Sequence, residues 1–211
     1  MAATKRKNIN PRVERKITRI SGVREVKQTF LIICEGVNTE PDYFNAFRLT
    51  SANVKAVGQG MGTLTLVQKA INIKKQEKLK GRTYNQNWVV FDKDDFPEND
   101  FNSAILLAQQ NGFEVAYSNQ AFEFWFLLHF NLYQGALHRS KYEKMLSTLL
   151  GFAYTKKSGV SSKMFNVLFP KQEQAIKHAK TIMKQFDGNN PAQQESSSTV
   201  FLLVEELNKF L

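Results

Sequence analysis

The chain has 211 residues, and its 42% apolar, 23% charged and 12% aromatic content is typical of a globular protein, which excludes collagen, coiled coils and wholesale disorder. A chain of this length buries roughly 70% of its unfolded surface, so it can fold without disulfides or metals. Its one cysteine, Cys34, excludes a disulfide framework and indicates a reducing compartment, and three histidines with no Cys-x-x-Cys pair exclude a structural zinc site. The longest apolar run, residues 121–130, is too short to span a bilayer. We therefore expect a soluble, cytoplasmic protein with no membrane partner.

The net charge of +10 is concentrated at the N-terminus, where residues 1–28 carry nine basic side chains and two acidic ones. Two interpretations fit this arm: a solvated tail, or a contact with nucleic-acid phosphates. A second basic stretch, residues 69–82, is interpreted as the solvated face of a helix. The candidate phosphate contacts are Lys5, Arg6, Lys7, Arg12, Arg15 and Lys16, together with Lys93.

From residue 29 onward, short β-rich runs alternate with helical patterns. This alternation predicts an α/β fold with a parallel sheet and helices on both faces. Thr39 and Asp42 have the spacing of a helix-capping box, and Asn119 can cap the helix that follows it. The predicted strands are 29–34, 53–57, 87–92 and 113–118, and the predicted helices are 39–47, 63–80, 101–110 and 121–130.

The last third of the chain shows no strong strand. Helical patterns occupy residues 139–150, 171–186 and 199–211, and residues 188–198 form a loop by composition. Gly151, Ser158 and Gly159 indicate an irregular connection after the first of these helices. We thus expect three parts: a basic arm (1–28), an α/β core (29–133) and a helical extension packed on that core (134–211).

Both strong strands end in acidic residues. Glu35 follows the first strand, and Asp92 and Asp94 end the third. The carboxyl ends of parallel strands converge at one sheet edge, and like charges about 4 Å apart repel by ~4 kcal/mol at an effective dielectric of 20. Protonation, a basic side chain or a cation must neutralise them; oxygen ligands favour Mg²⁺ or Mn²⁺. Gly36 fits a turn where backbone approaches a ligand closely.

A strand followed by Glu-Gly, and later a strand followed by Asp-x-Asp, resembles the TOPRIM pattern of topoisomerases, primases and OLD-type nucleases. Four stretches sharpen this resemblance: CEGVNTEPDYF (34–44), VVFDKDDF (89–96), SNQAFEFWFLLHF (118–130) and STVFLLVEEL (198–207). Together they resemble the RloB family over residues 29–211. The resemblance implies a TOPRIM/Rossmann-like core, divalent metal, phosphodiester chemistry, a nearby AAA/ABC-type ATPase and a role in abortive infection against phage.

Carried onto this chain, the resemblance makes Glu35 the TOPRIM glutamate and Asp92 and Asp94 the aspartate pair that hold the metal. OLD-type nucleases place a second acid four residues after the first; here that position is Thr39, and Glu40 follows it.

Other polar residues are candidates for the same crevice. Glu123, near the start of a helix, is a candidate ligand or supporting acid, and Asp95, Ser118 and Asn119 are candidates to line the crevice. His129 is either another crevice residue or a buried core histidine.

The main hypothesis from these residues is that the protein is a metal-dependent nuclease. Water would be the nucleophile, and Glu40 or Glu123 would be the general base. Two alternatives are a non-catalytic subunit that binds an ATPase through its C-terminal helices, and a haloacid-dehalogenase-type phosphatase with Asp92 as nucleophile. The chain has no P-loop, because GQGMGT (58–63) lacks the Lys-Ser/Thr ending. The sequence leaves open RNA or DNA as substrate, and whether the chain forms a homo-oligomer.

Overall fold

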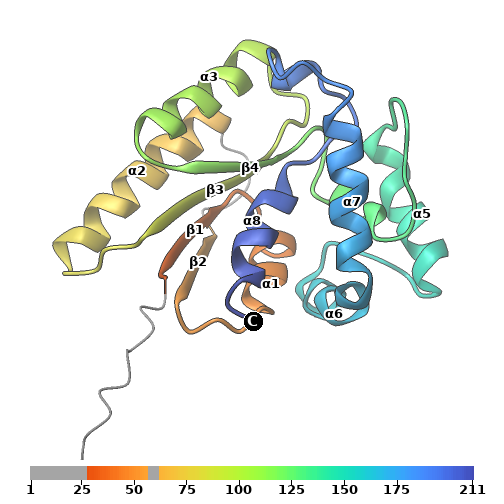
Figure 1. Ribbon diagram of the computed structural model, residues 1–211, viewed down its shortest axis with the longest axis horizontal. Helices are drawn as coiled ribbons and strands as arrows, with labels where there is room; N and C mark the ends of the chain where they lie inside the picture. Colours follow the sequence, from red (N-terminus) through yellow and green to blue (C-terminus); the bar gives the residue numbers. More distant parts are fainter. Residues whose placement is uncertain (1–27, 57–61) are drawn as a thin grey trace, which may run out of the picture.

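Four short strands form one parallel sheet in the order β2-β1-β3-β4 (Figure 1), as the alternating pattern predicts. The computed structural model describes residues 28–56 and 62–211; the basic arm and most of the glycine-rich turn after the second strand lie outside these ranges. The strands are β1 (Phe30–Cys34), β2 (Ala52–Ala56), β3 (Gln86–Asp92) and β4 (Glu114–Ser118).

The sheet is buried on both faces, which explains why β1 is continuously apolar. Phe30 and Ile32 face one core, whereas Leu31 and Ile33 face the other. The helices α2 (Thr63–Leu79) and α3 (Glu98–Gln110) cover one face, and α1 (Thr39–Asn45) and α8 (Val200–Asn208) lie on the other (Figure 1).

The chain reverses its winding direction between β1 and β3. Helix α1 connects β1 to β2 on one face, while α2 and α3 make their connections on the other. The loops that follow β1 and β3 therefore diverge, and the crevice between them is where open α/β sheets bind ligands. The N–H of Glu35 donates to the carbonyl of Val90 at 2.9 Å, so the ends of the two strands are held side by side.

The C-terminal third contains a helix that the sequence pattern did not predict. Helix α6 (Ser158–Leu168) includes Gly159, and its Met164 and Leu168 are fully buried. It packs against α1, and this tertiary contact outweighs the poor helix propensity of glycine. The other elements here are η1 (Arg139–Lys141), α5 (Tyr142–Leu150), η2 (Phe169–Lys171), α7 (Gln172–Met183) and η3 (Pro191–Gln193).

The segment before α8 runs beside the end of β4. Ser118 and Ser198 form an isolated antiparallel bridge, and the N–H of Thr199 donates to the carbonyl of Tyr117 at 2.8 Å. These contacts fix the last helix against the sheet. Over the described ranges, no helix is both long and apolar enough to cross a membrane.

Both predicted helix caps are wrong. Helix α1 begins at Thr39 itself and has no side-chain cap; the Asp42 N–H donates to the Asn38 backbone carbonyl instead, at 2.8 Å. Asn119 does not cap α4 (Glu123–Leu128) either, because its amide donates to two carbonyls of η3. For Asn119 the cause is a pair of long-range partners, which local spacing does not reveal.

Candidate active site

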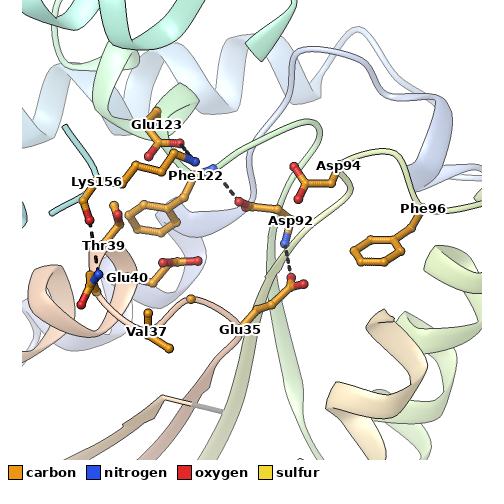
Figure 2. A pocket seen from close by; sticks show the side chains of 12 residues that line it. Glu35, Val37, Thr39, Glu40, Asp92, Asp94, Phe96, Phe122, Glu123 and Lys156 are labelled. Atoms are coloured by element: carbon orange, nitrogen blue, oxygen red, sulfur yellow. Dashed lines mark hydrogen bonds and ion pairs between the residues drawn. The ribbon is translucent and has the colours of Figure 1, made fainter. Parts of the chain in front are cut away.

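A cavity of about 290 Å³ lies beyond the carboxyl ends of β1 and β3, and the stick view in Figure 2 shows its lining. Five carboxylates and one lysine are among its lining side chains. The structure thus brings together acids from two strand ends and two helices: Glu35, Asp92, Asp94, Glu40 and Glu123, with Lys156 beside them.

Glu35 lies directly after β1 and is 8% exposed. Its Oε2 accepts a hydrogen bond from the Asp92 backbone N–H at 3.2 Å (Figure 2). Burial raises the pKa of Glu35 from 4.5 to about 7; the Asp92 N–H opposes this rise, and the charges of Asp94 and Glu40 add to it. The carboxyl group is therefore poised to gain or lose a proton near neutral pH.

Asp92 is the last residue of β3, and one of its two carboxylate oxygens is buried. Its Oδ2 accepts from the Phe122 N–H at 3.0 Å, but its Oδ1 is buried without a hydrogen-bond partner among the described residues. Burial, followed by the charges of Glu40 and Asp94, raises the pKa of Asp92 well above 3.8. A buried carboxylate oxygen without a partner is rare in native proteins, and a cation or a water molecule is a group that could satisfy it.

Glu40 comes from the first turn of α1 and is 5% exposed. Burial raises its pKa from 4.5 to about 7, and the charge of Glu123 adds to this rise. Its carboxylate occupies the space beside Gly36, where a Cβ atom would overlap it. The glycine predicted to permit close approach thus makes room for a second acid of the site.

Two of the five carboxylates are already paired with cations. Asp94 forms an ion pair with Arg139. Glu123 is paired with Lys156 at 3.1 Å and accepts from the Tyr154 hydroxyl at 3.0 Å.

The remaining three acids, Glu35, Glu40 and Asp92, form no ion pair within the described ranges. The cluster therefore has more carboxyl groups than ion-pair partners, which favours either protonation of these acids or a bound cation.

Three of these partners, Arg139, Tyr154 and Lys156, were missed in the sequence. They lie between α4 and α6, in a segment whose sequence gives no signal for contacts with Glu123 of α4 or with the loop after β3. Only the packing of α5 and α6 places them at the cavity.

Other predicted crevice residues lie elsewhere. His129 is fully buried, with its Nδ1 2.9 Å from the Trp125 carbonyl, so the core alternative is correct and the crevice assignment is wrong. Ser118 is also fully buried, its Oγ 3.2 Å from that of Ser198, and does not line the acidic cavity.

Asn119 and Lys93 line a neighbouring cavity of about 400 Å³. Asp95 lines it as well, is highly exposed and pairs with Arg139. The predicted phosphate contacts Lys5 to Lys16 lie outside the described residues.

The donor set fits a hard divalent cation in its chemistry. All unpaired donors are carboxylate oxygens, one of them a buried oxygen without a partner. Across residues 28–56 and 62–211, however, no three histidine, cysteine or acidic side chains are already arranged to enclose one ion. Asp94, a predicted ligand, is engaged by Arg139, so it would have to exchange this partner to contact a metal.

A doubly wound parallel sheet with an acidic cavity at its switch point defines an α/β protein with a candidate ligand site in the sheet crevice. The family model for RloB-like proteins matches residues 30–207, and the chain belongs to this family. The predicted family resemblance is therefore confirmed, and membership is consistent with a defence-associated protein. Neither the curated proteins nor the solved structures that were compared gave a significant match.

Proposed function

We propose that this protein is a divalent-metal-dependent nuclease of the TOPRIM type that cleaves RNA or DNA phosphodiesters. The observation that carries the proposal is the convergence of Glu35, Glu40 and Asp92 in one cavity, where none of the three forms an ion pair with a described residue. An anti-phage effector role with an ATPase partner is the biological setting that the family resemblance implies.

Electrostatics supports a cation at this place. A buried pair of like charges about 4 Å apart costs ~4 kcal/mol at an effective dielectric of 20, so the acids must share protons or a metal. Glu35 and Asp92 would hold the metal, with Asp94 joining them after release from Arg139. When bound, Mg²⁺ or Mn²⁺ would act as a Lewis acid for charge that develops on phosphate oxygens.

The two candidate general bases differ in availability. Both oxygens of Glu123 have partners, Tyr154 and Lys156. Glu40 forms no ion pair in the described part of the chain, and its pKa of about 7 is close to physiological pH, where a general base works best. Glu40 is therefore the better candidate to take the proton of an attacking water.

The test is cleavage of labelled RNA and DNA, single-stranded and double-stranded, with Mg²⁺ or Mn²⁺. Glu35→Gln and Asp92→Asn should each lower the rate at least about 100-fold, since losing one transition-state contact costs about 3 kcal/mol. Glu114→Gln is the matched control, because Glu114 is an exposed acid at the opposite, amino end of β4. Equal cleavage by the wild type and all three variants would overturn the proposal.

The ion pairs of Asp94 and Glu123 favour one alternative, a non-catalytic subunit whose acids are structural. Such a subunit would show no Mg²⁺-dependent gain in thermal stability, whereas a metal-binding nuclease would. The two functions are therefore separated by a melting experiment that requires no substrate.

A further inference from the structure

Two basic side chains, those of Arg139 and Lys156, lie next to the acidic cavity. Arg139 and Lys156 both line an adjoining cavity of about 420 Å³, which shares Asp94 and Glu123 with the acidic one. This volume lies in the range of small-molecule sites, roughly 300–1,000 Å³. A ligand in the adjoining cavity would therefore contact both cations and lie next to the acids.

Arg139 is held in a way that permits exchange of its partners. One guanidinium nitrogen pairs with Asp94 and the other with Asp95, whose side chain is 85% exposed. An ion pair this exposed contributes only about 0–1 kcal/mol. The backbone N–H of Arg139 donates to Gln120 Oε1 at 2.6 Å, so the main chain stays fixed when the guanidinium changes partner.

Lys156 is arranged similarly. Its side chain is 49% exposed, and its carbonyl accepts from Asn38 Nδ2 at 3.4 Å, which ties the main chain to the loop after β1. If the ammonium group turned toward a ligand, Glu123 would keep its hydrogen bond from the Tyr154 hydroxyl. The move therefore does not leave a buried carboxylate without any partner.

We propose that Arg139 and Lys156 form a phosphate-binding subsite that holds the backbone of a nucleic-acid strand beside the acidic cavity. The inference rests on the proposed function for the class of ligand. Five carboxylates repel a polyanion, so a strand needs fixed cations close by to approach them. The planar guanidinium suits this task because it can donate two parallel hydrogen bonds to one phosphate.

The test measures the binding of a fluorescently labelled single-stranded oligonucleotide. Binding is measured by fluorescence anisotropy in the presence of EDTA, at several salt concentrations. Arg139→Gln and Lys156→Gln should each weaken binding about 10-fold and reduce the salt slope by about 0.7. Lys141→Gln and Lys157→Gln are matched controls, because these exposed lysines are close in sequence and do not line the cavity. Equal weakening by the controls and the subsite variants would overturn the proposal.

A gain of binding excludes misfolding as the explanation. Asp95→Asn removes one of the two partners of Arg139 and should tighten binding, whereas Asp100→Asn, an exposed acid on α3, should not. Equal tightening by both would mean that only net charge matters and would overturn the subsite. Competition with inorganic phosphate and with a nucleoside 5′-monophosphate distinguishes a strand-binding site from a site for a small phosphate compound. A strand-binding site requires the oligonucleotide to bind far more tightly than either competitor. Displacement of the oligonucleotide by equimolar phosphate would refute it.

The outcomes also separate this inference from the proposed function. Because binding is measured without divalent ions, a wild type that never cleaves would refute the nuclease and leave the subsite standing. Unchanged binding by Arg139→Gln and Lys156→Gln, beside metal-dependent cleavage by the wild type, would refute the subsite alone.

Discussion

Replacing Glu40 by glutamine should stabilise the protein at alkaline pH in the absence of metal. The pKa of Glu40 is raised from 4.5 to about 7, so the folded state holds this proton more tightly than the unfolded state. The resulting stabilisation is fully present below pH 4.5 and is lost as the pH rises through about 7. The difference corresponds to about 3 kcal/mol, which is the cost of the ionised group in the wild type at pH 8.

Urea unfolding in EDTA at pH 8 and pH 4.5 measures this effect. Glu40→Gln should be more stable than the wild type at pH 8 by up to about 3 kcal/mol, or about 6–12 °C in Tm, and should lose that advantage at pH 4.5. Glu114→Gln, an exposed acid, should behave like the wild type at both pH values. A Glu40→Gln variant that was destabilised more at pH 8 than at pH 4.5 would show that the carboxylate is stabilising when ionised, and would refute the reasoning.

Three further predictions concern the same cavity. Mg²⁺ at 100 times its Kd should stabilise the wild type by about 2.7 kcal/mol in thermal melts and leave Glu35→Gln unchanged; equal shifts would place the ion elsewhere. Gly36→Ala should displace the Glu40 carboxylate, the proposed general base, and lower Mg²⁺-dependent cleavage roughly 100-fold while the Mg²⁺-dependent shift in the melts remains; unchanged cleavage would contradict this role of Glu40. Tyr154→Phe should cost about 1–3 kcal/mol in urea unfolding, because it removes a hydrogen bond to buried Glu123; no loss would mean that Lys156 suffices.

The sheet could be predicted because its signal is local. The run Phe30–Cys34 is continuously apolar and fully buried, so its composition alone indicated a central strand. The meeting of Glu35 and Asp92 followed from the same step, because parallel strands place their carboxyl ends at one edge. The strand ends differ from the predicted ones by at most one residue.

The rest depends on contacts between distant segments. Helix α6 forms despite Gly159 because it packs against α1; Val160, Met164 and Leu168 do recur at helical spacing, but the glycine near its start made the segment look like a loop. The pairing of Asp94 with Arg139 joins residues 45 positions apart. Such partners are set by the packing of α5 and α6, so the sequence indicated the acids of the site but not the cations that balance two of them.

The antiparallel bridge between Ser118 and Ser198 has a consequence for self-association. The bridge lies at Ser118, the last residue of the edge strand β4. Unpaired backbone N–H and C=O groups at such an edge would otherwise be free to pair with a strand of another chain. A truncation that removed residues 197–211 would uncover this edge together with the apolar sheet face beneath α8. We expect such a fragment to aggregate. Residues 197–211 would then prevent the addition of another chain to the sheet edge, besides forming part of the core.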